Sequence, residues 1–124
     1  MILADTSIWV NHLRKADAAM QRLLQRQLIA IHPFVIGEIA LGHLGNREVI
    51  LQSLWELPAV TVASDREALA FIEAHSFVGL GIGYVDVHLV AAVKLSPNTG
   101  LWTRDKRLAA AAKLLGLETG EELE

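Results

Sequence analysis

The sequence contains no cysteine, and few of its 124 residues are charged. A chain without cysteine has no disulfide framework, no thiolate zinc site and no cysteine nucleophile. Charged residues make up 20% of the chain and hydrophobic residues 52%, which excludes a disordered polyampholyte, a collagen-like fibre and a coiled coil. This length and composition predict a single domain, residues 1–124, with ample apolar content for a core.

Long apolar runs and a secretory signal are also missing. A membrane-spanning helix needs about 20 apolar residues, whereas the run from Leu89 to Val93 has five. No basic residue precedes Asp5, unlike the start of a secretory signal. We therefore expect a cytoplasmic protein with no membrane segment.

Short apolar segments alternate with longer amphipathic ones along the chain. The short segments predict strands at residues 2–4, 29–31, 59–62 and 101–103. The longer segments predict helices at residues 8–13, 16–27, 33–43, 47–55, 66–75, 84–95 and 105–115, and residues 118–124 are expected to be frayed. Strands that are apolar throughout favour a mainly parallel sheet of four to five strands, covered by helices in a three-layer α/β/α domain.

Two acidic residues, Asp5 and Asp105, follow predicted strands closely. They are expected at the carboxyl edge of the sheet, where open α/β sheets bind ligands. The alternative is that each is only a helix N-cap, a position that aspartate favours. Both interpretations are compatible, because a helix N-terminus stabilises a carboxylate.

Two further acidic residues, Asp86 and Glu38, lie inside apolar helical segments. A charge buried alone costs several kcal/mol, so each must be paired, metal-bound or neutral. The structural alternative for Asp86 is bonding to free N–H groups in the first helical turn. For Glu38 it is an ion pair with Arg14 or Arg104.

Convergence of these four carboxylates would require a cation. Two such charges about 4 Å apart repel by about 4 kcal/mol at an effective dielectric constant near 20. Mg²⁺ or Mn²⁺ suits all-oxygen ligands, and such an ion can activate water and stabilise a phosphoryl group during transfer. The histidines lack zinc-binding spacing, and the glycines at 79, 81 and 83 form neither a Walker loop nor a dinucleotide-binding motif.

The chain resembles the PIN-domain nucleases, and most closely the VapC-type ribonuclease toxins of toxin–antitoxin pairs. The resemblance spans essentially the whole chain, and four segments carry it: LADTSIW (3–9), VIGEI (35–39), GYVDVHLVAA (83–92) and LWTRDKRL (101–108). It implies a PIN-like fold and Mg²⁺- or Mn²⁺-dependent cleavage of single-stranded or loop RNA. The implied catalytic and metal-binding residues are Asp5, Glu38, Asp86 and Asp105.

The same resemblance implies supporting groups and partners. Thr6 and Thr103 match a hydroxyl that family members often place beside the acids. Some members carry a further acid where this chain has Lys106 and Arg107, which leaves one or two metal ions possible. The implied partners are RNA, a second copy of the chain in a homodimer, and a small VapB-type antitoxin that covers the site.

Other functions compete with a toxin ribonuclease. A PIN nuclease of RNA maturation would share the same acids, and a catalytically silent module would use them only to bind a cation. A phosphatase of the haloacid dehalogenase type needs a second aspartate two residues after the first, but Ser7 stands there.

The acidic net charge of −3 argues at first against an RNA-binding protein. Four of the 14 acidic residues are the candidate ligands, and four more are glutamates of the terminal segment, which leaves six against 11 basic residues. The basic residues beside the last candidate acid, Arg104, Lys106 and Arg107, are predicted to contact RNA phosphates. The net charge is therefore compatible with an RNA substrate that binds weakly without a divalent cation.

Overall fold

A computed structural model describes residues 1–119 of the chain. Within this range three strands, β1 (Ile2–Ala4), β2 (Ile29–Ala30) and β3 (Gly100–Trp102), form a parallel sheet in the order β2-β1-β3. The helices are α1 (Thr6–Arg14), α2 (Ala18–Gln25), α3 (Pro33–Ala40), α4 (Arg47–Trp55), α5 (Asp65–Ala74), α6 (Tyr84–Leu95) and α7 (Lys106–Leu114). No helix in the described range is both long and apolar enough to span a membrane.

The predicted parallel sheet is confirmed, but the predicted number of strands is wrong for the described residues. The fourth expected strand, residues 59–62, contributes only one bridge, between Ala59 and Ile31. It then leaves the sheet, because the Thr61 N–H donates to the Ser96 hydroxyl at 3.0 Å.

The expected fraying at residues 118 and 119 is also wrong. Glu118 forms a bridge with Leu101 at the opposite edge of the sheet, and the Thr119 N–H donates to the Leu101 carbonyl at 2.8 Å. The rest of the segment expected to be frayed, residues 120–124, lies outside the described residues.

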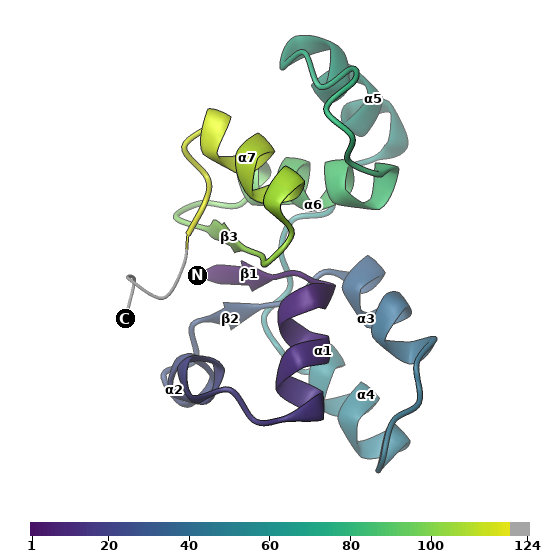
Figure 1. The fold of residues 1–124 in the computed structure, drawn as a ribbon, viewed down its shortest axis with the longest axis vertical. Coiled ribbons are helices and arrows are strands. Elements are labelled where there is room, and N and C mark those ends of the chain that lie inside the picture. The colour runs from purple at the N-terminus through teal and green to yellow at the C-terminus, as the bar shows by residue number, and fades with distance from the viewer. Residues whose placement is uncertain (120–124) are drawn as a thin grey trace.

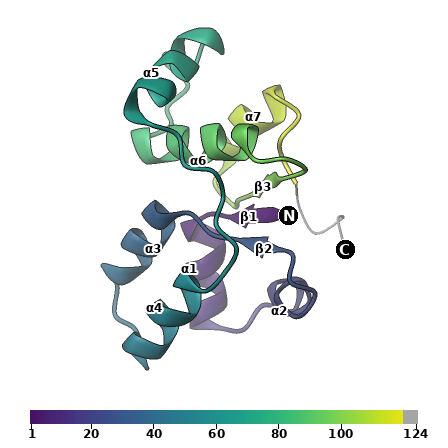
Figure 2. The same ribbon diagram turned by 180° about the vertical axis from the view of Figure 1, so that it is seen from behind.

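Helices cover both faces of the sheet, as expected for a three-layer α/β/α domain. In Figure 1, α1 and α7 lie on the nearer face, whereas α4 and α6 come to the front when the molecule is turned in Figure 2. The strands are parallel, so their carboxyl ends share one edge. Helices α1 and α7 begin at that edge, soon after the ends of β1 and β3.

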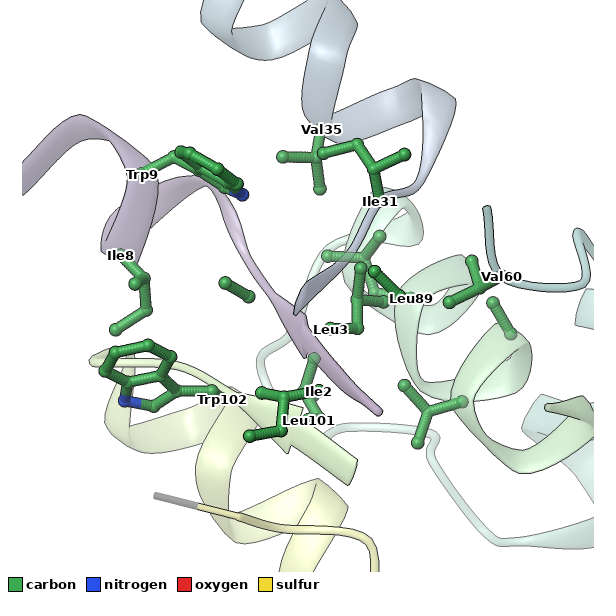
Figure 3. Packing of buried hydrophobic residues seen from close by; sticks show 14 of the residues in the cluster. Ile2, Leu3, Ile8, Trp9, Ile31, Val35, Val60, Leu89, Leu101 and Trp102 are labelled. Atoms are coloured by element: carbon green, nitrogen blue, oxygen red, sulfur yellow. The ribbon is translucent and has the colours of Figure 1, made fainter. Parts of the chain in front are cut away.

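The hydrophobic core surrounds the central strand. Figure 3 shows buried side chains of β1 and β3 together with those of α1, α3 and α6. Leu3 of β1 and Leu101 of β3 have no exposed surface. Helix α6 is buried over residues 87–93, in agreement with its nearly continuous apolar sequence. A buried helix of this kind places Asp86, next to its first buried residue, in low-dielectric surroundings.

Candidate active site

Asp5 lies at the carboxyl end of β1 and is the N-cap of α1. Its side chain is only 4% exposed. One carboxylate oxygen, Oδ1, accepts from the Ile8 N–H at 3.2 Å and from the Ser7 hydroxyl at 2.5 Å. The other, Oδ2, accepts a short hydrogen bond from the Thr103 hydroxyl. Three donors thus orient this buried carboxylate.

Thr103 and Ser7 connect Asp5 to the segment after β3. The Thr103 hydroxyl accepts from the Asp105 N–H at 3.0 Å while donating to Asp5. The Ser7 hydroxyl accepts from the Arg104 N–H at 3.1 Å while donating to Asp5. These bonds join positions about a hundred residues apart in sequence, so they fix the ends of β1 and β3 relative to each other.

Asp105 is the N-cap of α7. Its Oδ1 accepts from the Arg107 N–H at 2.9 Å and from the Leu108 N–H at 3.0 Å. The N-cap alternatives weighed for Asp5 and Asp105 are therefore both correct as descriptions of the backbone. They do not compete with ligand binding, because a helix N-terminus is a favourable position for a carboxylate and the rest of Asp105 is exposed.

Glu38 is an exposed residue of α3. Its Oε1 accepts from the Thr6 hydroxyl at 2.5 Å. Among the described residues, no ion pair joins it to Arg14 or to Arg104, whose guanidinium lies 3.4 Å from Asp17. The structural alternative of an arginine pair for Glu38 is therefore wrong, and its hydrogen-bond partner is a hydroxyl from α1.

Asp86 lies in the first turn of α6 and is partly buried. Its Oδ2 accepts from the Gly83 N–H at 3.3 Å. Burial raises the pKa of Asp86, and the negative charges of Asp105, Asp5 and Glu38 raise it further. Three acids from other parts of the chain therefore act electrostatically on Asp86.

The site fits a divalent cation in its donor chemistry but does not form a closed cage. Among residues 1–119, no three His, Asp or Glu side chains converge tightly enough to hold a metal ion. The acids instead bind hydroxyl and backbone N–H donors. The atoms that these acids offer to a metal are all hard carboxylate oxygens. The negative charges that raise the pKa of Asp86 repel its carboxylate, and a bound cation would relieve this repulsion.

The three basic residues predicted to contact RNA differ in their surroundings. Arg104 pairs with Asp17 at the start of α2. The Arg107 guanidinium lies 3.5 Å from the Gly81 carbonyl, in the glycine-containing segment before α6. Lys106 is exposed at the first position of α7. Only Lys106 presents a charge without a described protein contact.

A groove of about 510 Å³ opens beside Glu38. It runs between α1 and the α3–α4 connection, and its lining includes Val10, Arg14, Ile39 and Asn46. Of the four candidate acids, Glu38 alone lines this groove within the described residues.

Sequence reasoning missed Ser7 as part of this site. Its hydroxyl contacts both Asp5 and the Arg104 backbone, whereas from the sequence Ser7 was weighed only as the residue that stands where a phosphatase needs a second aspartate. The signal was the Asp5-Thr6-Ser7 run, which places two hydroxyls in the first turn after a strand.

Comparison with known proteins gives relatives in sequence and in structure. The chain is 42% identical over 123 residues to Ribonuclease VapC32 of two Mycobacterium tuberculosis strains, CDC 1551 / Oshkosh and ATCC 25618 / H37Rv. The match covers 99% of this chain and 99% of each relative. No family model matches the chain.

Among solved structures, the chain is similar to the crystal structure of PAE2754 from Pyrobaculum aerophilum. The TM-score is 0.65, and the match covers 98% of this chain and 90% of that chain. At 16% sequence identity, this likeness supports the fold alone.

Proposed function

Because the chain belongs to the VapC family of ribonucleases, we propose that it hydrolyses phosphodiester bonds within RNA with the help of bound Mg²⁺ or Mn²⁺. The proposed ligands and catalytic residues are Asp5, Glu38, Asp86 and Asp105. The observation that carries the proposal is that the three other acids all raise the pKa of Asp86, so the four share one electrostatic environment. A carboxylate with a purely structural role would not be expected to lie near three other acids.

In this proposal the four acids have two different roles. Asp5 and Asp86 anchor the ion, while Glu38 and Asp105 complete its shell and orient the attacking water. A bound divalent ion supplies positive charge that activates water and offsets charge developing on the phosphate.

The hydroxyl groups of the chain position these acids. Thr103 holds Asp5 in place and bonds to the backbone of Asp105, so one hydroxyl fixes an anchoring acid relative to an orienting one. Thr6 does the same for Glu38, which otherwise extends from an exposed helix face. Pre-formed positions of this kind lower the cost of ordering the site when substrate binds.

We further propose that Lys106 contacts an RNA phosphate near the acids. It is exposed directly after Asp105 and has no described protein partner. Arg104 would bind RNA only if it released Asp17. Arg107 would bind RNA only if it released the Gly81 carbonyl.

The cleavage assay is the test of this function. Purified protein is incubated with single-stranded RNA in Mg²⁺, in Mn²⁺ and in excess chelator, and Asp5→Asn is assayed beside it. Cleavage should require the metal and should be lost in the variant. Full metal-dependent cleavage by Asp5→Asn would show that the assignment of the site is wrong.

We also propose that the protein is a single-domain toxin that forms a homodimer and is held inactive in the cytoplasm by a VapB-type antitoxin. The support is its 42% identity to proteins named Ribonuclease VapC32. Co-purification with the product of the neighbouring gene tests this role. Cut sites are then mapped in total RNA after that partner is removed, and a freely active protein with no such partner would favour a nuclease of RNA maturation.

A further inference from the structure

The exposed face of α3 carries more than Glu38. Phe34 lies one helical turn before Glu38, on the same face, and keeps 39% of its surface exposed. Gly37 lies between them and is also exposed. An aromatic ring is thus displayed on the same surface as a proposed catalytic acid, about one turn away.

The described residues leave free space where a side chain at Gly37 would lie. Apart from the backbone of its own helix and its chain neighbours, a Cβ atom added there would meet no heavy atom of the described residues within 4 Å, and the backbone is not in a conformation that favours glycine. Glycine inside a helix is less favourable than alanine because it loses more backbone freedom on folding. Its effect in the fold is to leave the surface between Phe34 and Glu38 open.

A second exposed ring continues this surface on α6. Tyr84 is 44% exposed, and its hydroxyl donates to Asp65 at 2.7 Å. The rings of Tyr84 and Phe34 both pack edge-to-face against buried His88, with centroid separations of 4.6 and 4.9 Å. Both rings are therefore held in place from one side, while the other side remains in solvent.

We propose that Phe34, Gly37 and Tyr84 form a subsite that stacks an RNA base next to the phosphate cut at the acids. The inference rests on the proposed ribonuclease function and names how that substrate is held. Rings fixed in orientation stack bases without selecting their identity, because every base has a π face. The open surface at Gly37 gives the nucleotide a path from Glu38 to the rings.

The first test measures cleavage kinetics of a short single-stranded RNA. Because stacking one base contributes about 1–3 kcal/mol, Phe34→Leu and Tyr84→Leu should each raise KM about tenfold and change kcat little. Tyr84→Phe keeps the ring and should raise KM less than Tyr84→Leu. The control is Trp55→Leu, which removes a ring that is 63% exposed on α4, a helix without a proposed site residue. It should leave KM unchanged.

The second test separates substrate binding from folding. Both Gly37→Ala and Gly37→Leu place a better helix former where the protein has room, so both should raise the unfolding temperature. Only the leucine is large enough to fill the open surface, so it alone should raise KM about tenfold. A purely structural glycine would give the opposite result, with loss of stability in both variants.

The outcomes distinguish this inference from the proposed function. If the wild-type protein cuts no RNA in Mg²⁺ or Mn²⁺, both fail. If it cuts RNA but Phe34→Leu, Tyr84→Leu and Gly37→Leu keep the wild-type KM, only the stacking subsite is wrong. Loss of binding to a protein partner with unchanged KM would likewise overturn the subsite and assign this face to that partner.

Discussion

The two sides of the candidate site hold their acids in different ways. On the anchored side, Asp5 and Asp105 are N-caps, and between them they accept five hydrogen bonds from backbone and hydroxyl donors. On the open side, Glu38 and Asp86 each accept one hydrogen bond within the described residues. The anchored side is built from β1, β3, α1 and α7, and the open side from α3 and α6.

This difference shows how the fold combines a fixed site with access for a substrate. Parallel strands deliver the anchored acids to one edge of the sheet, where hydroxyls and helix N-termini hold them. Glu38 lines the groove, and each open acid shares its helix with one exposed ring, Glu38 with Phe34 and Asp86 with Tyr84. Changes to acids on either side should therefore affect catalysis, and changes on the open side should also affect substrate binding and local stability.

The largest effect is expected for Asp5→Asn. Asparagine also caps helices, so the variant should fold, but loss of a charged ligand should lower RNA cleavage about a thousandfold. Asp17→Asn is the matched control because Asp17 caps α2 in the same way, through the Met20 N–H at 2.9 Å. Initial cleavage rates at saturating metal give the comparison. Equal losses in both variants would mean that capping, and not the acidic site, is responsible.

The second prediction concerns acid sensitivity on the open side. Burial first, and the charge of His88 second, lower the pKa of His32, the N-cap of α3, from 6.5 to about 4. Between pH 6.5 and about pH 4 the unfolded chain therefore binds more protons than the folded protein does. Stability is then complete above pH 6.5 and decreases as the pH falls to about 4, by about 3 kcal/mol in total.

His32→Asn tests this contribution. Asparagine can accept the hydrogen bond that the Phe34 N–H donates to His32, but it does not titrate. Urea unfolding of both proteins across this pH range should show a smaller acid-induced loss in the variant. Parallel pH profiles would assign the acid sensitivity to other groups.

The third prediction returns to the anchored side. Thr103→Val keeps the shape of the side chain but removes the hydroxyl that joins Asp5 to the Asp105 backbone. Groups that orient metal ligands typically contribute about tenfold to a hundredfold in affinity or activity. We expect a loss of that size in cleavage and in Mn²⁺ affinity. Thr99→Val removes a hydroxyl that, in the part of the chain that the structure describes, bonds only to the Pro97 carbonyl, and it should change neither quantity.

The smallest effect is expected for Thr6→Val. Within residues 1–119 its hydroxyl bonds only to Glu38, on an exposed surface where one hydrogen bond contributes about 1 kcal/mol. We expect cleavage to fall about threefold to tenfold, less than in Thr103→Val. Steady-state kinetics of the two valine variants on one RNA make the comparison. A larger loss for Thr6→Val would reverse the roles assigned to the two sides.

The order of elements and the chemistry of the acids could be predicted from sequence, because both depend on local patterns. Short apolar runs that end at Asp5 or just before Asp105 mark strand ends at one edge of a sheet. An acid such as Asp86 within an apolar helix indicates that its carboxylate is paired, bound to a metal ion or neutral.

Features that depend on contacts between distant segments could not be predicted. The segment expected to form a strand at residues 59–62 pairs with the sheet through one bridge, because the Thr61 N–H donates to the Ser96 hydroxyl. Ser7 reaches the Arg104 backbone 97 residues away. Arg107 was assigned to RNA by its position next to the acids, but its guanidinium contacts the segment before α6.

The most direct test of the central claim, that acids from both sides form one metal site, is calorimetric titration of Mn²⁺ into the wild-type protein and into Asp5→Asn and Asp86→Asn. These variants each remove one charge, the first from the anchored side and the second from the open side. The wild type should bind Mn²⁺, and both variants should bind it at least about tenfold more weakly. Unchanged affinity in either variant would contradict a single site shared by the two sides.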